Sequence, residues 1–448
     1  MDLRDETISI LAPGGVISRR LPGYEDRPQQ IEMAEAVAEA FCQGEHLVVE
    51  AGTGVGKSFA YLIPAILFAT EAKEPVVVST NTISLQEQLI DKDIPFLRET
   101  LPLDFTAVLV KGRGNYVCLR RLNMVATSER GLFETRDEVE EFDRILEWSK
   151  ITSDGSLADL LPNPPESIWS MICSESDNCL SSKCEFFGRC FYYRARGKVL
   201  GADIIVVNHH LLLSDYVLRK MNIGVAVLPD YQHLIIDEAH NLESIATAHI
   251  GREVTNWRVK RLLDGLYRPP RRSGHPGGVL VRMGAVEHIP LVEEARRSAE
   301  IFFDLLSKWL DENETMAIER EGFLPNLLEE PILKLEELLR DLRKRAKDES
   351  EEMEITAFIR RCHKLRDDLD DILSLGTEGY VYWVERTGRR FANLSLNAAP
   401  ITVADELRED FFSNMRTIVA TSATLAVNGS FDFFKGRVGL ENARELLI

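Results

Sequence analysis

Residues 51–58, AGTGVGKS, have the types and spacing of a phosphate-binding loop. In such a loop backbone N–H groups surround phosphates at the start of a helix, a lysine reaches the β and γ oxygens, and a hydroxyl ligates magnesium. Lys57 and Ser58 stand at the positions for the last two roles, and Ala51 replaces the usual first glycine. The residues expected to hold the phosphates are Ala51, Gly52, Thr53, Gly54, Val55, Gly56, Lys57 and Ser58.

Such a site also needs an acidic residue at the end of a neighbouring strand, and HLIIDEAH, residues 233–240, provides one. Asp237 ends an apolar run, where its carboxylate can hold magnesium through water, and Glu238 can polarise the attacking water. Alone, an Asp-Glu pair after a strand is usually a helix cap with solvated carboxylates. Downstream of a phosphate loop it favours hydrolysis of a nucleoside triphosphate, with Lys57, Asp237 and Glu238 as catalytic residues.

A parallel α/β sheet is expected to position these side chains. Short apolar runs typical of buried strands alternate with helical patterns, which is the signature of such a sheet. The runs lie in residues 46–51, 75–80, 202–215, 233–242 and 416–425. The pattern breaks twice, at about residues 111–200 and 250–378. We therefore predict a phosphate-loop domain with two insertions, and a hairpin over residues 380–396 that turns near Thr387-Gly388.

Length and composition limit the classes of protein to which this chain can belong. A chain of 448 residues is too long for one compact domain, and 45% hydrophobic with 28% charged residues is typical of a soluble globular protein. No run of about 18 apolar residues lacks a charge, and the amino-terminal stretch has no signal-peptide character. We expect a cytoplasmic protein without a membrane partner.

Four of the seven cysteines, Cys118, Cys179, Cys184 and Cys190, lie in the first predicted insertion at a spacing that ends C-x4-C-x5-C. Thiolates at this density suit either a 4Fe-4S cluster or zinc, and the spacing alone does not decide between them. Cys173 is a fifth candidate. The aromatic and arginine residues between 186 and 196 suit the stacking of single-stranded bases, or a small core of the insertion itself.

Taken together, AGTGVGKS, DEAH and TSAT resemble motifs I, II and III of superfamily 2 helicases. GYEDRPQQ, STNTISLQEQL, KGRGNYVC, ADIIVVNHHLLLSD and LSLNAAP resemble segments of the DinG/XPD group in particular. The resemblance covers nearly the whole chain. It implies a RecA-like motor domain and an ATP-dependent helicase or translocase acting on single-stranded or forked DNA, 5′ to 3′, in DNA repair or replication.

The same resemblance assigns roles to further residues. Arg27 and Gln30 would bind the nucleotide. Thr80, Asn81 and Gln86 would lie near the DNA backbone, and Asn208 and His209 near the strand path or the nucleotide. The residues expected to couple hydrolysis to movement are His240, Thr421, Ser422 and Thr424.

For the cysteines, the resemblance implies a 4Fe-4S cluster on Cys118, Cys179, Cys184 and Cys190, with Cys173 as a spare thiol. We expect Cys42 and Cys362 to be packing residues. The implied division is residues 1–110 motor domain, 111–200 cluster insertion, 201–249 motor domain, 250–378 helical arch, 379–425 motor domain, and 426–448 the start of a link.

No sequence after TSATL resembles the second motor domain of the group. By resemblance, the chain reads as the amino-terminal part of such a helicase. We therefore expect it to bind ATP, magnesium and DNA but not to unwind alone, a second chain being one source of the missing domain.

Charge is unevenly spread. The formal net charge of -19 argues against a surface that is basic all round. Residues 251–272 nevertheless carry seven basic side chains against two acidic ones, and Lys111, Arg113, Arg120 and Arg121 form a second cluster. Such clusters are either solvated helix faces or a nucleic-acid path.

Two rival functions stay open from the sequence. One is an iron-sulfur nucleic-acid-binding regulator that binds nucleotide without unwinding. The other is a phosphate-loop kinase or another small-molecule nucleoside triphosphatase, in which DEAH, TSAT and the cysteine insertion have no place.

Overall fold

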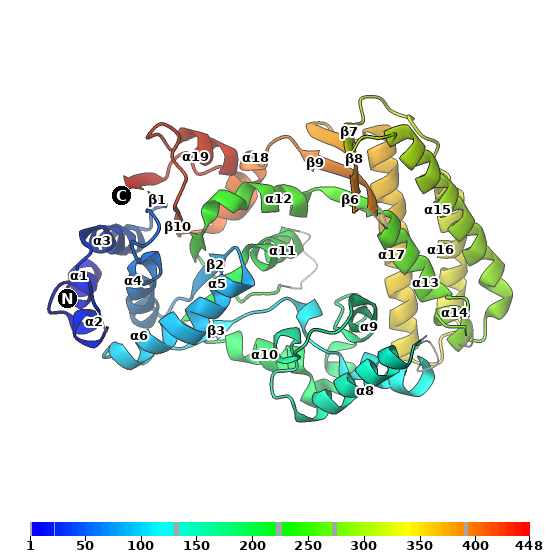
Figure 1. Cartoon of the computed structure of the whole chain (residues 1–448), viewed down its shortest axis with the longest axis horizontal. Helices are drawn as coiled ribbons and strands as arrows, with labels where there is room; N and C mark the ends of the chain where they lie inside the picture. Colours follow the sequence, from blue (N-terminus) through cyan, green and yellow to red (C-terminus); the bar gives the residue numbers. More distant parts are fainter. Residues whose placement is uncertain are drawn as a thin grey trace. The chain divides into compact units, whose positions relative to one another are not determined.

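The structure, a computed structural model, describes residues 2–21, 23–129, 133, 135–220, 226–270, 276–388 and 393–448. The chain divides into two compact units (Figure 1). Unit 1 is built from three stretches, residues 1–111, 195–250 and 402–448, and unit 2 from two, residues 112–194 and 251–401. No helix in the described part of the chain combines the length and apolar character that crossing a bilayer requires.

Unit 1 contains a parallel sheet of seven strands among the described residues, so the predicted parallel α/β fold is confirmed. In spatial order the strands are β11 (Arg444–Leu447), β1 (Leu47–Glu50), β10 (Thr417–Ser422), β5 (His233–Asp237), β2 (Val76–Thr80), β4 (Ile204–Asn208) and β3 (Ala107–Leu109).

Helices cover both faces of this sheet. Side chains of alternate residues in each strand point to opposite faces, so they are buried in two different cores. In β2, Val76 and Val78 enter one core and Val77 the other. The helices that pack in the first core include α1 (Leu3–Leu11), α3 (Pro28–Gln43), α4 (Lys57–Ala72) and α6 (Ile94–Thr100). Those in the second are α11 (His209–Lys220), α12 (Leu242–Ile250) and α19 (Asp432–Val438).

The strand order brings distant motifs together. Strand β10 lies between β1 and β5, although about 180 residues separate it from β5 in the chain. Val49 is in register with Thr421, and Thr421 with Asp237. The carboxyl ends of these three neighbouring parallel strands therefore meet at one edge of the sheet, the usual place for a ligand site in an open α/β fold.

Unit 2 is built differently. It has a four-stranded antiparallel sheet, β6 (Arg252–Thr255), β9 (Asn393–Pro400), β8 (Tyr380–Thr387) and β7 (Thr315–Ala317) in spatial order. Helices α15 (Ile289–Leu310), α16 (Glu329–Arg343) and α17 (Glu349–Ser374) pack side by side in the same core, with α13 (Asn256–Leu266) beside them (Figure 1). The cysteine-rich stretch of unit 2 carries the helices α7 (Leu119–Met124), α8 (Arg136–Ile151), α9 (Glu166–Ile172) and part of α10 (Phe191–Val199).

The predicted hairpin is the β8–β9 pair, with Thr387 opposite Asn393. Gly388 is the last described residue before the turn, and the rest of the turn lies outside the described residues. The hairpin pairs with β6 and β7 in unit 2, whereas the sequence division assigned residues 379–401 to the motor domain. The hairpin belongs to unit 2 because β9 pairs with β6. This pairing joins residues that are far apart in the chain, so no local sequence pattern predicts it.

Candidate functional site

The phosphate loop connects β1 to α4, which begins at Lys57. Gly54 and Gly56 have φ angles of 88° and 86°, a left-handed conformation that glycine adopts without strain. The Lys57 ammonium donates to the Ala51 carbonyl at 3.3 Å. The Ala51 N–H donates to the Ser422 carbonyl at 3.0 Å. The loop is thus tied directly to the end of β10, which carries the TSAT motif.

Helix α3 brings the two predicted nucleotide-binding residues against this loop. Gln30 is buried, and its side-chain amide donates to the Gly56 carbonyl at 2.8 Å. Arg27 precedes α3 as its N-cap, and one guanidinium nitrogen lies 3.6 Å from the position that a Cβ at Gly56 would occupy. The Arg27 side chain also pairs with Glu25 at 3.0 Å. Sequence reasoning placed both residues beside the nucleotide, and they meet at the loop.

Asp237 lies at the end of β5 and is only 6% exposed. Its carboxylate accepts hydrogen bonds from the Tyr61 hydroxyl at 3.1 Å and from the Glu238 N–H at 3.0 Å. Burial, followed by the neighbouring charge of Glu238, raises the pKa of Asp237 to about 6. A cation beside this carboxylate would favour its charged form.

A short chain of hydrogen bonds joins the DEAH and TSAT motifs. The Ser422 hydroxyl lies 2.7 Å from Nδ1 of His240 and donates to the Glu238 carboxylate at 3.3 Å. His240 also lies 3.4 Å from Glu238. Glu238 has a left-handed φ of 56°, an uncommon conformation for a glutamate that aims its side chain across to β10. The predicted general base and the predicted coupling residues are therefore in direct contact.

The remaining TSAT residues pack around the same strand end. Thr421 is fully buried in β10, and its hydroxyl has no hydrogen-bond partner within the described residues. The Thr424 N–H donates to the Ser422 hydroxyl at 3.4 Å. The Glu50 carboxylate at the end of β1 accepts from the N–H groups of the two residues after TSAT, the second at 2.6 Å from Ala426. Glu50 thus holds this turn beside the phosphate loop.

The three residues predicted near DNA after β2 differ in accessibility. Thr80 is fully buried, and Gln86 is 5% exposed with an amide nitrogen that has no hydrogen-bond partner among the described residues. Asn81 is partly exposed at the start of the turn that leads into α5 (Ile83–Gln88). Asn81 is therefore the member of this set with surface available to a strand.

Asn208 and His209 end β4 and begin α11. The Asn208 side chain accepts from the Leu211 N–H at 2.8 Å, which caps the helix. His209 is fully buried, with Nδ1 2.7 Å from the Ser79 hydroxyl, and burial lowers its pKa to about 4. A buried neutral ring has no surface for a direct DNA contact, so the expected DNA contact of His209 does not follow from this fold.

Cys118, Cys179, Cys184 and Cys190 all line one cavity in unit 2. Burial opposes ionisation of Cys179, but hydrogen bonds from the Ser181 N–H, at 3.4 Å, and from Arg113 lower the pKa of its thiol. Cys173 is buried elsewhere, with a pKa raised by burial. Within the described residues no three Cys, His, Asp or Glu side chains converge tightly enough to hold one metal ion.

The two other cysteines behave differently from each other. Cys362 is fully buried in the helical core of unit 2, where burial raises its pKa to about 12, and its predicted packing role is confirmed. Cys42 is exposed at the end of α3, so its predicted packing role is wrong. The last turn of α3 turns this position to solvent, although the helix as a whole is apolar.

Most basic residues of the 251–272 stretch are paired with acids. Arg252 pairs with Asp371 at 2.7 Å, and Arg258 with Asp368 at 2.8 Å. The Lys260 ammonium lies 2.5 Å from Asp264, and the Arg261 guanidinium 3.2 Å from Glu175. Arg271 and Arg272 lie outside the described residues. The local positive charge read from the sequence is therefore largely balanced within unit 2.

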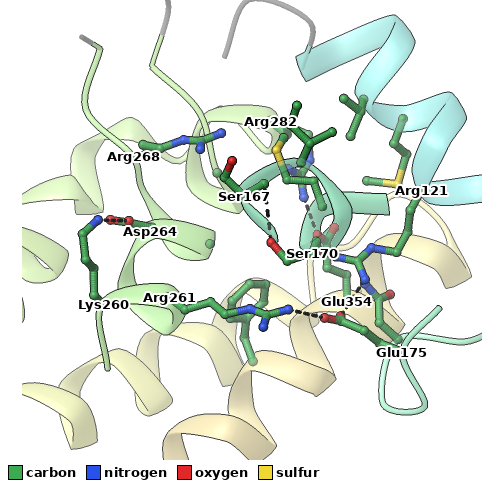
Figure 2. Close-up of a pocket in the computed structure, with 18 of the residues that line it drawn as sticks. Arg121, Ser167, Ser170, Glu175, Lys260, Arg261, Asp264, Arg268, Arg282 and Glu354 are labelled. Atoms are coloured by element: carbon green, nitrogen blue, oxygen red, sulfur yellow. Dashed lines mark hydrogen bonds and ion pairs between the residues drawn. The ribbon is translucent and has the colours of Figure 1, made fainter. Parts of the chain in front are cut away.

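A pocket of about 390 Å³ gathers several of these cations between the cysteine-rich stretch and α13 and α17 (Figure 2). Arg121 and Arg261 point toward Glu175 from different elements. Both Arg361 and Glu354 come from α17, and Arg361 binds Glu175 at 2.8 Å and Asp177 at 2.6 Å. The six cations that line the pocket are Arg121, Lys260, Arg261, Arg268, Arg282 and Arg361, against four acidic residues.

Sequence reasoning missed Tyr61, Glu50 and Ser79. Tyr61 follows Lys57 by four residues, so both lie on the same face of α4, and that spacing could have indicated it. Glu50 directly precedes the loop, but its contact with Ala426 depends on the pairing of β1 with β10. Ser79 was predicted only as a strand residue, and its contact with His209 was missed because the two lie 130 residues apart in the chain.

Comparison with known proteins gives concordant results. A family model described as DEAD/DEAH box helicase matches residues 28–125, and one described as DEAD_2 matches residues 174–259. The chain is similar to the Haemophilus influenzae protein named ATP-dependent DNA helicase YoaA, with 30% identity over 100% of this chain and 67% of that protein. It is 32% identical to the Escherichia coli K12 protein of the same name, over 98% of this chain and 66% of that protein.

A Bacillus subtilis protein named 3′-5′ exonuclease DinG is 28% identical over 95% of this chain and 48% of its own length. The chain thus spans about two thirds of the YoaA relatives and about half of this one. A solved structure titled XPD_Helicase matches 95% of the chain with a TM-score of 0.50 at 15% identity, which supports the fold. The chain belongs to the DinG/YoaA-type family of DEAD/DEAH-box ATP-dependent DNA helicases.

Proposed function

We propose that this chain forms the ATP-hydrolysing motor of a helicase or translocase that moves on single-stranded or forked DNA, 5′ to 3′, in DNA repair or replication. The observation that carries the proposal is the contact of Glu238 and His240 with Ser422 beside the phosphate loop. A site that only bound nucleotide would not need the end of β10 to touch the side chain that activates water.

In this proposal the loop from 51 to 58 binds the ATP phosphates, with Lys57 on the β and γ oxygens and Arg27 and Gln30 beside the nucleotide. Ser58 and Asp237 present hydroxyl and carboxylate oxygens, the ligand type that magnesium prefers. When bound, magnesium neutralises charge on the phosphates and orients them. The buried carboxylate of Asp237, with a pKa raised to about 6, gains a partner for its charge in that arrangement.

Glu238 then acts as the general base that orients and deprotonates the attacking water. Its carboxylate is held by Ser422 and lies next to His240, so a change at the γ-phosphate is transmitted to β10. Thr421 and Thr424 flank Ser422 on the same strand end. We propose that this contact couples hydrolysis to movement along DNA, with Asn81 and Asn208 nearest to the strand path.

We also propose that Cys118, Cys179, Cys184 and Cys190 bind a 4Fe-4S cluster. Four separate thiols around one cavity fit this group, in which each iron takes one cysteine. The amide and guanidinium donors at Cys179 favour its thiolate, the form that ligates iron. A cluster would cross-link a stretch of about 80 residues whose helices, apart from α8, are short.

The proposed division assigns residues 111–200 to the cluster domain and about 250–378 to a helical arch. This chain matches about two thirds of the YoaA relative from Haemophilus influenzae. We propose that strand separation also needs polypeptide equivalent to the remaining third. That polypeptide could belong to the same protein or to a second chain. The chain itself is proposed to hydrolyse ATP in a DNA-dependent way.

The direct test is ATP hydrolysis with and without single-stranded DNA, followed by unwinding of a duplex with a 5′ tail. Lys57→Ala should abolish ATP turnover while the thermal unfolding temperature and metal content stay unchanged. Turnover that survives in this variant would refute the phosphate-loop assignment. DNA and nucleotide binding without strand separation, even with a partner chain, would favour the regulatory alternative.

The cluster has its own test. Purified protein should contain about four irons and labile sulfide per chain, and Cys179→Ser should lose both. Cys173→Ser is the matched control, because this thiol lies outside the cavity, and it should keep its iron. Stoichiometric zinc in place of iron would overturn the cluster.

A further inference from the structure

We infer that Tyr61 is a positioning residue that holds the magnesium-binding side chains of the ATP site in place. The inference rests on the proposed function. Tyr61 is fully buried in α4, and its hydroxyl donates to one carboxylate oxygen of Asp237 at 3.1 Å. The other carboxylate oxygen accepts from the Glu238 N–H at 3.0 Å. With one donor on each oxygen, the carboxylate plane cannot rotate freely.

The Tyr61 hydroxyl has a second neighbour in the same site. The Ser58 hydroxyl is a polar neighbour of the Tyr61 oxygen and of the Asp93 carboxylate, so the phenol lies beside both side chains proposed to meet magnesium, directly or through water. Tyr61 reaches this point because it follows Lys57 by one turn of α4. Its ring lies in the apolar core between α4 and the sheet, which leaves the oxygen a narrow range of positions.

Magnesium in such sites keeps several waters and demands nearly ideal octahedral geometry. A carboxylate that turns away from the required orientation therefore weakens binding even when its charge is unchanged. Tyr61 does not touch the nucleotide in this scheme. Its loss should weaken the magnesium-dependent part of ATP binding and leave the contacts of Lys57 with the phosphates intact.

The experiment is a titration of the whole chain with a fluorescent ATP analogue, in EDTA and over a range of Mg²⁺ concentrations. Tyr61→Phe keeps the ring and removes the donor. The Kd in EDTA should stay within about twofold of wild type, whereas the Mg²⁺ midpoint should rise about tenfold, the lower end of what a hydrogen bond to a charged group contributes. At saturating Mg²⁺ the rate of hydrolysis should recover most of its wild-type value.

Tyr231→Phe is the matched control, because Tyr231 is also a buried tyrosine of unit 1, and its hydroxyl has no hydrogen-bond partner in the described residues. It should leave the Mg²⁺ midpoint unchanged. Tyr61→Met is a second variant without a donor, for use where Tyr61→Phe is poorly folded by circular dichroism.

Three outcomes would overturn the inference: an unchanged Mg²⁺ midpoint in the Tyr61 variants, an equal rise in Tyr231→Phe, or a parallel weakening of binding in EDTA. Failure of the proposed function is a separate result. In that case Lys57→Ala would still bind the ATP analogue, whatever the Tyr61 variants do.

Discussion

Replacing Asp237 by asparagine is expected to stabilise the metal-free protein at neutral pH while abolishing ATP hydrolysis. The carboxylate is 6% exposed, and burial raises its pKa to about 6. Asparagine has nearly the same shape without the charge. Its carbonyl can accept from the Glu238 N–H, and its amide can donate to the Tyr61 oxygen, so both hydrogen bonds of the site can be kept.

The size of the change in unfolding free energy follows from the linkage between folding and protonation of Asp237. A folded-state pKa of about 6 against the ordinary 3.8 means that the folded protein binds the Asp237 proton more tightly than the unfolded chain. Above pH 6 the buried charge therefore costs about 3 kcal/mol of unfolding free energy, at 1.36 kcal/mol per pH unit. The cost falls to roughly half at pH 5 and vanishes below about pH 3.8, where the carboxyl is neutral in both states.

Thermal unfolding of the two proteins in EDTA at pH 7.5 and pH 5 measures this difference. For a unit of this size, about 3 kcal/mol corresponds to a rise in Tm of roughly 6 °C or more at pH 7.5, with a smaller rise at pH 5. Asp104→Asn, at an exposed aspartate of the same unit, should stay within about 0.5 kcal/mol. A destabilised Asp237→Asn protein, or an equal gain at both pH values, would refute the reasoning.

Three further predictions concern contacts described above. Ser422→Ala should leave ATP binding unchanged but lower the rate of hydrolysis about tenfold, because Glu238 loses a hydrogen bond to a charged group; an unchanged rate would contradict the coupling. Arg361→Ala removes the partner of two carboxylates and should lower the unfolding free energy of unit 2 by about 1 to 3 kcal/mol, measured by denaturant unfolding. Cys362→Ser should cost about 1 to 3 kcal/mol because it buries a hydroxyl, whereas Cys42→Ser, at an exposed position, should change stability by less than about 0.5 kcal/mol in the same assay.

The elements that carry the motifs could be predicted from local patterns. Five runs of buried apolar residues indicated strands of a parallel sheet, and the structure has β1, β2, β4, β5 and β10 within those runs. The phosphate loop was predicted between a strand and a helix, and it connects β1 to α4 with Gly54 and Gly56 at positive φ. These features depend on residues that are close together in the chain, so they can be predicted from one sequence. Strands β3 and β11 were not predicted, because they are short and only partly buried.

Contacts between distant residues were decided by the tertiary structure. The sequence shows that Arg361 carries a positive charge. Only the fold shows that Glu175 and Asp177, more than 180 residues earlier in the chain, pair with it. Likewise the helical, apolar context of Cys42 predicted a packing residue, and the structure shows an exposed one. The resemblance placed His209 near the strand path or the nucleotide, and only the fold shows that its ring is buried.

By itself, then, the sequence determined the chemical groups of this protein: a phosphate loop, an acidic pair, a TSAT strand end and four clustered cysteines. Only the tertiary structure decided which of these groups touch, because β10 has to pair between β1 and β5 before Ser422 can reach Glu238 and His240. Strand order depends on the packing of whole helices on both faces of the sheet, and no short stretch of residues carries that information.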